Sequence, residues 1–272
     1  GTTFSFGSRT RIDQNGFGNP NLVQDQATGK LVAVYHDNSS RGKASIVTIS
    51  GTTPSFGTEY QFSSSAAFSK KAVYDSSSNK IVIAYRGASN YGQAVVATVS
   101  GSTITYGTVY TFNSSITNIA GLAFDSGSNK VTVVVSDQGD SNYGKYAIGE
   151  VSGTSISFGS LVTYTTGDGG ISTIGYDSNA GKNLICFSDY NNSNYGTSFI
   201  LSTSNVADFI GITDAAISSG ASGSVTIKGG VATNADISTP AVTTLGSKVV
   251  FDDGGPTPGI ALAYDPDTAK VL

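Results

Sequence analysis

The chain has 272 residues, of which only 12% are charged, and its formal net charge is -4 at pH 7. Without a basic stripe, counterion release could not drive tight binding to nucleic acid, and no apolar run approaches the roughly 20 residues that a membrane-spanning helix needs. With 34 glycines and 38% hydrophobic residues, the composition is typical of an all-β protein with many tight turns and excludes a disordered chain.

The sequence repeats itself with a period of about 50 residues. A period of this length predicts one supersecondary unit copied in tandem. We divide the first 203 residues into four repeats, 1–50, 51–100, 101–152 and 153–203. Each repeat carries an aspartate followed five residues later by a lysine, and the same pair recurs near the end of the chain: Asp25/Lys30, Asp75/Lys80, Asp125/Lys130, Asp177/Lys182 and Asp265/Lys270.

The second repeat, residues 51–100, predicts four short strands. Thr58–Phe62 alternates polar and aromatic residues, which is the pattern of a strand with one buried face, and Lys71–Tyr74 is a short second strand. Ile81–Tyr85 and Ala94–Val99 are apolar throughout, as expected for a sheet stacked between two similar sheets. We therefore predict an all-β fold, a β-propeller of about five blades built from four-stranded repeats, with a β-solenoid as the main alternative.

The two ends of the chain depart from the repeat. Thr2–Ile12 resembles a fourth strand without the three that should precede it, and we expect it to close the ring as an outer strand of the last blade. Residues 204–272 are either an atypical fifth blade with an insertion at about 215–255 or a separate C-terminal β-module, and Asp265/Lys270 favours the blade. Because the sequence has no methionine, not even at residue 1, we expect the N-terminus to arise by processing, by proteolysis or by design, with any targeting segment removed.

The loop between the last two strands of a repeat collects carboxylates and amides that are possible calcium ligands. Asp137, Asp140 and Asp189 are weak candidates for a Ca²⁺ site because hard oxygen ligands suit this ion. However, the second repeat has Gly87 at this place, and loops of Asp, Asn, Ser and Gly need no metal to explain them. We expect no other cofactor. The Asp/Lys pairs themselves we interpret as structural, the aspartate capping a tight turn and the lysine opening the next strand.

Three tyrosines in Ser-Asn-Tyr-Gly segments are candidate glycan contacts. Tyr91, Tyr143 and Tyr195 occupy the same position in repeats 2, 3 and 4, where a tyrosine on a polar loop can stack on a sugar. The alternative is that each packs over the edge of its own blade. The first repeat has Arg41 instead, so a full ring of equivalent sites is not expected.

Catalytic motifs are not found in the sequence, and we predict that the protein is not an enzyme. His36, the only histidine, aligns with Arg86 and with serines of the other repeats, which is typical of a strand-end surface residue. Cys186, the only cysteine, lies where the other repeats have Val or Ala and is expected to be a small buried side chain. A glycosidase would need two carboxylates facing one cleft, and nothing in the sequence indicates such a pair.

Several motifs resemble those of phage tail-fibre and virion-associated β-propeller proteins. They are Tyr-Asp-x-x-x-Asn-Lys-Ile-Val-Ile-Ala-Tyr, Asn-Ser-Asn-Tyr-Gly and Val-Ser-Gly-Thr-Ser-Ile-Ser-Phe-Gly, and residues 208–230 are similar to a segment that follows such repeats. In those chains a terminus similar to Ala269–Leu272 is common, which implies a natural C-terminus here. The resemblance covers essentially the whole chain, implies a structural or adhesive role and carries no catalytic residues. Similar repeats also occur in bacterial surface proteins.

We therefore predict a non-enzymatic structural or adhesive β-propeller, in a phage tail fibre or an extracellular surface filament, located outside the cell or in a virion. A lectin-like carbohydrate-binding propeller is the alternative, and a glycoside hydrolase is a remote one. The expected partners are further copies of the chain, joined into an oligomer or filament by strand complementation, and a cell-surface glycan.

Overall fold

The computed structural model describes residues 7, 9 and 16–201, together with five short strands between residues 209 and 271. The chain divides into two compact units, residues 1–203 and 204–272. Apart from one 3₁₀ turn, Ala88–Asn90, the described elements are antiparallel strands, so the prediction of an all-β fold is confirmed. In this part of the chain no helix is long and apolar enough to cross a membrane.

The strand that follows each Ser-Gly turn pairs with the strand before it, so the sheets are out of phase with the sequence repeats. From here on, repeats 1 to 4 denote the sheets of residues 18–66, 68–116, 117–168 and 172–201.

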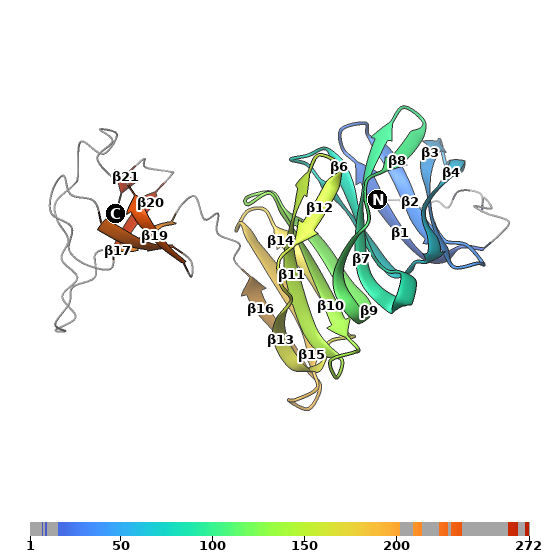
Figure 1. The fold of residues 1–272 in the computed structure, drawn as a ribbon. Coiled ribbons are helices and arrows are strands. Elements are labelled where there is room, and N and C mark those ends of the chain that lie inside the picture. The colour runs from blue at the N-terminus through green and yellow to red at the C-terminus, as the bar shows by residue number, and fades with distance from the viewer. Residues whose placement is uncertain are drawn as a thin grey trace, which may run out of the picture. The chain divides into compact units, whose positions relative to one another are not determined.

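Repeat 1 is a four-stranded antiparallel sheet in which each strand pairs with the next one along the chain (Figure 1). Its strands are β1 Gly18–Asp25, β2 Lys30–His36, β3 Arg41–Ser50 and β4 Thr53–Ala66. Repeat 2 has the same order, with β5 Phe68–Asp75, β6 Lys80–Arg86 and β7 Tyr91–Ser100 as its first three strands. In repeat 2 the fourth strand is divided between β8 Thr103–Tyr106 and the first half of β9 Tyr110–Asp125, both of which pair with β7.

The strand β9 belongs to two repeats. Its first residues pair with β7, whereas Thr117–Asp125 pairs with β10, so one continuous strand joins repeats 2 and 3 in a single nine-stranded sheet. Repeat 3 then continues through β10 Lys130–Asp137 and β11 Tyr143–Ser152, and its fourth strand is again divided, into β12 Ser155–Phe158 and β13 Val162–Asp168.

Repeat 4 has three strands, β14 Ser172–Asp177, β15 Lys182–Asp189 and β16 Tyr195–Leu201. Within the described residues β16 pairs only with β15, so its other edge carries no partner strand there. Among the described residues this sheet therefore has one strand fewer than that of repeat 1.

The repeats stack face to face, and the apolar core lies between them (Figure 1). Val32 and Val34 of repeat 1 share a buried cluster with Ile81 and Ile83 of repeat 2. The opposite face of repeat 2 is packed against Val131 and other side chains of repeat 3. Both faces of the middle sheets are therefore covered, which explains why their strands are apolar throughout.

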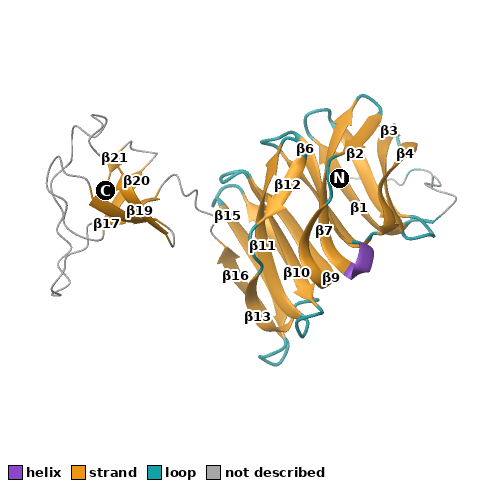
Figure 2. Ribbon diagram, viewed as in Figure 1, coloured by secondary structure: helices purple, strands orange, loops and turns teal. Residues whose placement is uncertain are grey.

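The Asp/Lys pairs close the turn between the first two strands of each repeat. Figure 2 shows the loops and turns between the strands in teal. The Oδ1 atom of Asp75 accepts hydrogen bonds from the backbone N–H groups of Ser77 and Ser78, at 2.8 and 3.1 Å, and Asp75 is only 1% exposed. The residue just before the lysine has a positive φ angle, 55° at Asn79 and 70° at Gly29, which glycine and asparagine tolerate best. The structural interpretation of these pairs is thus confirmed.

The second unit contains a five-stranded sheet in the order β19-β18-β17-β20-β21. Its strands are β17 Phe209–Thr213, β18 Gly223–Ile227, β19 Gly230–Ala235, β20 Ala261–Asp265 and β21 Lys270–Val271. Asp265 and Lys270 form the last pair of the β20–β21 hairpin, in the register of the other four Asp/Lys pairs. The strands β18 and β19 fall within the predicted insertion at 215–255, and the rest of that range lies outside the described residues.

A closed propeller of five blades is not shown. None of the described sheets closes on itself. Of the predicted ring-closing strand Thr2–Ile12 only residues 7 and 9 are described, and neither is in a strand, so that prediction lies largely outside the described residues.

Candidate functional site

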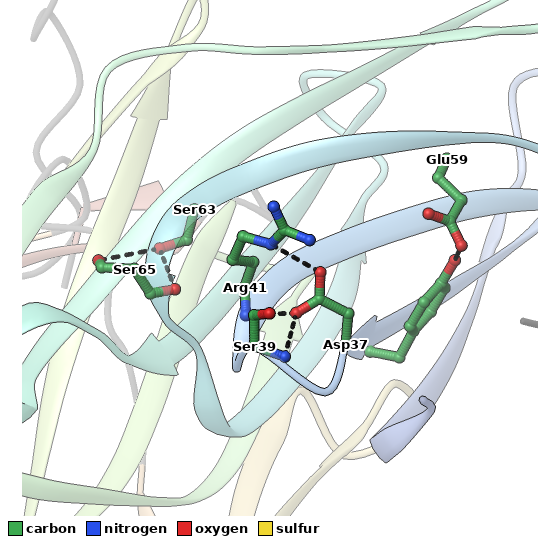
Figure 3. A network of polar contacts seen from close by, with 7 residues as sticks. Asp37, Ser39, Arg41, Glu59, Ser63 and Ser65 are labelled. Carbon is green, nitrogen blue, oxygen red and sulfur yellow. Dashed lines mark hydrogen bonds and ion pairs between the residues drawn. The ribbon is translucent and has the colours of Figure 1, made fainter. Parts of the chain in front are cut away.

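In repeat 1 the loop aspartate is neutralised by an arginine of the same loop. Asp37 Oδ1 accepts hydrogen bonds from the backbone N–H groups of Ser39 and Arg41, and its Oδ2 lies 2.8 Å from Arg41 Nε (Figure 3). Burial raises the pKa of Asp37, but the hydrogen bonds and the charge of Arg41 outweigh it and hold the pKa below its ordinary value. The same figure shows that Glu59 accepts a hydrogen bond from the Tyr35 hydroxyl, so this carboxylate also has a structural partner.

In repeat 3 a lysine lies between two of the calcium candidates. Lys145 Nζ is 2.9 Å from Asp137 Oδ2 and also forms an ion pair with Asp140. Burial raises the pKa of Asp137, and the hydrogen bond from Lys145 more than offsets it, so the carboxylate stays ionised. The ammonium group of Lys145 therefore neutralises the two carboxylates that were candidate calcium ligands. In the described part of the chain no group of three or more His, Cys, Asp and Glu side chains could hold a metal ion.

Asp189, the corresponding aspartate of repeat 4, has no such partner. Its Oδ1 accepts one hydrogen bond, from the backbone N–H of Asn191 at 3.1 Å. The position of Lys145 is taken by Thr197, and among the described residues no lysine or arginine forms an ion pair with Asp189. One oxygen of a half-buried carboxylate is thus left for a ligand or for water.

A hollow of about 340 Å³ opens between repeats 3 and 4 at this carboxylate. Tyr164 and Phe187 meet there with ring centroids 5.2 Å apart, and Asn191 Nδ2 donates a hydrogen bond to Thr166 Oγ1 at 3.0 Å. The hollow combines aromatic surface, hydroxyl groups, an amide and a carboxylate. Its lining comes from β13 and from the end of β15 with the turn that follows: Thr163, Tyr164, Thr165, Thr166, Phe187, Asp189 and Asn191.

The rings in the hollow repeat a packing contact seen elsewhere in the fold. Phe62 and Tyr85, between repeats 1 and 2, also lie 5.2 Å apart with the same interplanar angle of 67°. The Tyr164 hydroxyl also forms a hydrogen bond with Ser172 Oγ, at 2.6 Å. Burial raises the pKa of the Tyr164 phenol, so this hydroxyl stays neutral. The Tyr164 ring at the base of the hollow is therefore held both by a ring contact and by a hydrogen bond.

The three tyrosines predicted as glycan contacts lie apart from the hollow. Tyr91, Tyr143 and Tyr195 each begin the third strand of a different repeat, and none of them lines the hollow. Tyr91 and Tyr143 are partly buried, whereas Tyr195 is 62% exposed. Of the calcium candidates only Asp189 lines the hollow. Its remaining lining residues were not predicted from the sequence.

Comparisons with known proteins returned matches among solved structures only. No protein-family model matches the chain, and no curated protein matches it. An exo-β-1,3-galactanase from Phanerochaete chrysosporium, solved with β-1,3-galactotriose, matches with a TM-score of 0.44 and 10% identity over 68% of this chain and 46% of that chain. An exo-β-1,3-galactanase from Clostridium thermocellum matches with a TM-score of 0.45 and 10% identity, over 89% of this chain and 61% of that one. The chain thus spans about half the length of the structures it matches first.

These matches correct two of our predictions. We predicted a structural or adhesive protein that is not an enzyme, whereas the matching solved structures are carbohydrate-active enzymes. The prediction of a non-enzymatic structural role is therefore wrong; it rested on the uncharged, turn-rich repeat, on the resemblance to tail-fibre repeats and on the absence of catalytic motifs. The resemblance to phage tail-fibre repeats, self-assembly and an extracellular location stay predictions.

Proposed function

We propose that this protein binds a carbohydrate in the hollow between repeats 3 and 4. The observation that carries the proposal is the unpaired oxygen of Asp189 beside the aromatic base. Sugar hydroxyls are matched by carboxylate, amide and threonine groups, and the apolar face of a sugar ring is matched by an aromatic surface. In repeats 1 and 3 the equivalent carboxylate is bound to a basic side chain, which removes it from any ligand.

Carbohydrate binding can be tested by comparing substitutions at two aspartates of repeat 4, one inside the hollow and one outside it. Asp189 and Asp177 both accept backbone hydrogen bonds in turns at the ends of β15, but only Asp189 lines the hollow. We expect Asp189→Asn to weaken glycan binding at least about tenfold, as loss of a charge-assisted hydrogen bond of about 1.5–3 kcal/mol requires. Asp177→Asn should leave binding unchanged. Binding would be measured by titration calorimetry, after a glycan array has identified a ligand.

Each outcome of this binding experiment either supports or contradicts the proposed site. Equal losses in the two variants would indicate a general effect on repeat 4 and would contradict the site. An array without any bound glycan would refute the proposal itself. Replacement of Tyr195 by Ala measures whether this exposed ring extends the site, with the partly buried Tyr91 as its comparison.

Hydrolysis of a glycosidic bond is the second candidate, favoured by a second carboxylate near the hollow. Asp168 ends β13, and its Oδ1 accepts only the backbone N–H of Gly170, at 2.8 Å. Gly167 next to it lies against Tyr190 and Asn191 of the facing turn, since a Cβ atom at residue 167 would be 3.1 Å from that of Tyr190. Asp168 thus follows a residue that contacts the turn after Asp189, although it does not itself line the hollow, and two carboxylates are what glycoside hydrolysis requires.

Release of reducing sugar from a panel of polysaccharides, with β-1,3-galactan among them, would test this second candidate. If the two aspartates divide the acid and base roles, Asp168→Asn and Asp189→Asn should each lower the rate about 10²-fold or more. A glycan that binds but is not cleaved by the unaltered protein would exclude hydrolysis and leave the binding proposal standing.

We also propose that the stacked repeats form part of a β-propeller of about five blades. The face-to-face packing of successive four-stranded sheets and the fifth Asp/Lys hairpin support this arrangement.

A further inference from the structure

The loop that carries Asp189 has the same backbone conformation as the loop that carries Asp137 in repeat 3. In both loops the aspartate carbonyl oxygen accepts a hydrogen bond from the backbone N–H three residues later, at 2.9 Å in repeat 4 and 3.0 Å in repeat 3. The last two loop residues have positive φ angles, 53° and 61° in repeat 4 and 54° and 63° in repeat 3. Side chains at equivalent positions of the two loops can therefore be compared directly.

In repeats 1 to 3 a carboxylate at the start of this loop comes with a cation, and where the carboxylate is missing the cation is missing too. The two ion pairs are Asp37 with Arg41 and Asp137 with Lys145. Repeat 2 has Gly87 at the aspartate position and the neutral Gln93 at the position of the lysine. A Cβ atom at Gly87 would overlap Gln93 Oε1, so the glutamine fills the place of the carboxylate. Each of these three loops thus balances the charge of its first residue.

Repeat 4 keeps the carboxylate without the cation. Thr197 stands at the position of Lys145, since each lies two residues after the tyrosine that begins the third strand. Asn192 stands at the position of Asp140, which in repeat 3 is the second carboxylate bound by the lysine. The lysine and one of its two partners are therefore replaced by neutral residues, whereas the other partner is retained as Asp189. A half-buried carboxylate without a counter-ion is a group to which a cationic ligand can bind strongly.

The contact between repeats 3 and 4 also has more room than the contact between repeats 2 and 3. A Cβ atom at Gly139 would overlap Ser115 Oγ, so this serine fills the space beside the loop of repeat 3. The corresponding residue beside the loop of repeat 4 is Gly167. Ser115 and Gly167 each follow by three residues the ring that covers the third-strand glycine, Phe112 or Tyr164. A serine and a lysine are thus replaced by a glycine and a threonine, which leaves room for the hollow of about 340 Å³.

The lining of the hollow is negatively charged. Among the described residues that line it, Asp189 is the one with a charged side chain. A glycan with carboxylate or sulfate groups would be repelled by this aspartate, and a neutral glycan would form only hydrogen bonds with it. An ammonium group would form an ion pair as well, and a hydrogen bond between two charged groups is the stronger kind.

We propose that the carbohydrate bound in the hollow is an amino sugar, whose ammonium group pairs with Asp189 as the Lys145 ammonium group pairs with its aspartate in repeat 3. The inference rests on the carbohydrate-binding proposal and names the class of its ligand, a glycan of hexosamine units with free amino groups. The sugar ring would lie on the aromatic base formed by Tyr164 and Phe187. Acetylation of the nitrogen removes the charge and enlarges the group, so N-acetylated glycans should bind poorly.

The tetramers of glucosamine and of N-acetylglucosamine are a matched pair of ligands for the test. They share the same rings and linkages and differ in the acetyl groups on nitrogen. Titration calorimetry of the full-length protein at slightly acidic pH, where the glucosamine amines are charged, would measure both. We expect the glucosamine tetramer to bind at least about tenfold more tightly, because it alone forms the charge-assisted hydrogen bond. The glucose tetramer, which has no nitrogen, should bind no better than the acetylated one.

Two pairs of variants test the role of the loop. Asp189→Asn should abolish the preference for the free amine, whereas Asp177→Asn, which removes the same charge in the turn before β15, should preserve it. Thr197→Lys supplies the cation that repeat 3 has and should weaken binding of the glucosamine tetramer at least about tenfold. Gln93→Lys adds the same charge at the equivalent position of repeat 2 and should leave that binding unchanged. If Thr197→Lys fails to fold, the comparison of the two aspartate variants still decides.

Four results would overturn the inference, and the first two leave carbohydrate binding standing. They are equal binding of the two tetramers, and binding only of glycans that have no free amine. A preference for the amine that persists in Asp189→Asn would assign it to another carboxylate. Binding of hexamethylenediamine as tight as that of the glucosamine tetramer would show a site for an ammonium group without a sugar. If no glycan binds at all, the proposed function itself is refuted.

Discussion

A buried lysine without a carboxylate partner distinguishes the contact between repeats 1 and 2. Lys70 is 3% exposed, and its Nζ lies 3.1 Å from the Gly18 carbonyl oxygen and 3.0 Å from His36 Nδ1. Among the described residues it forms no ion pair with a carboxylate. Burial lowers its pKa to about 8. The pKa of His36 is also lowered, first by burial and then by the charge of Lys70, so the neutral imidazole can accept a hydrogen bond from the lysine ammonium group.

This lysine should make stability depend on pH. Because its pKa is lower in the folded than in the unfolded protein, the unfolded chain binds more protons between about pH 8 and 10, and the free energy of unfolding should rise with pH in that window. Lys70→Met, which keeps the apolar stem, should remove this rise and be more stable at pH 7. Urea unfolding of both proteins at several pH values measures the difference, and parallel pH curves would contradict the assignment.

At the scale of an element, the second residue of the third strand is a glycine in all four repeats, and the space beside it shows whether a fourth strand covers it. A Cβ atom at Gly42 would lie 2.4 Å from Phe62 Cε2, and one at Gly144 would lie 2.6 Å from Tyr164 Cζ. In each case an aromatic ring of the fourth strand occupies the space. At Gly196 of repeat 4, where the described residues contain no fourth strand, no atom lies within 4 Å of the corresponding position.

The three glycines should therefore respond differently to the same substitution. Gly42→Ala and Gly144→Ala force a ring out of its packed position, and such overpacking costs about 1–3 kcal/mol of the free energy of unfolding. Gly196→Ala should cost nothing and could add a few tenths of a kcal/mol, since alanine restricts the unfolded chain. Denaturant midpoints of the three variants check this, and a loss at Gly196 as large as that at Gly144 would reveal a covering strand.

Most of the repeat architecture could be predicted from the sequence, because it depends on local chemistry. The five-residue spacing of Asp75 and Lys80 follows from a turn in which a carboxylate caps two backbone N–H groups and Asn79 adopts a positive φ angle. The all-β fold follows in the same way from apolar strands bounded by these turns.

The candidate site could not be predicted in this way, because it depends on which strands become neighbours. Tyr164 belongs to none of the motifs that we singled out, and it meets Phe187 only because β13 lies beside the next repeat. One signal was present nonetheless: Thr197 stands where repeat 3 has Lys145, which leaves Asp189 as the loop aspartate without a cation. When repeats are aligned and one of them lacks the basic residue that pairs with an aspartate in the others, that aspartate is a candidate for a free carboxylate, even without a catalytic motif.

For the whole molecule, stability should decline from the middle repeats toward repeat 4. Repeats 2 and 3 are covered on both faces, whereas Leu184 and Ile200 lie exposed and the backbone edge of β16 carries no partner strand in the described part of the chain. Regions with few buried contacts open first. We expect the amides of β16 to exchange hydrogen at least about 10²-fold faster than those of β6 and β10, as measured by mass spectrometry. Uniform protection along the chain would contradict this gradient.

The long strand β9 also sets how the molecule would respond to a pulling force. Because β9 pairs with β7 at one end and with β10 at the other, no slack loop separates repeats 2 and 3. A force applied to the ends of the chain would be transmitted from one sheet to the next through β9, and we expect repeats 2 and 3 to unfold together. Between repeats 3 and 4 the chain instead turns through Gly169 and Gly170, so a force would first extend that connection and detach repeat 4 alone.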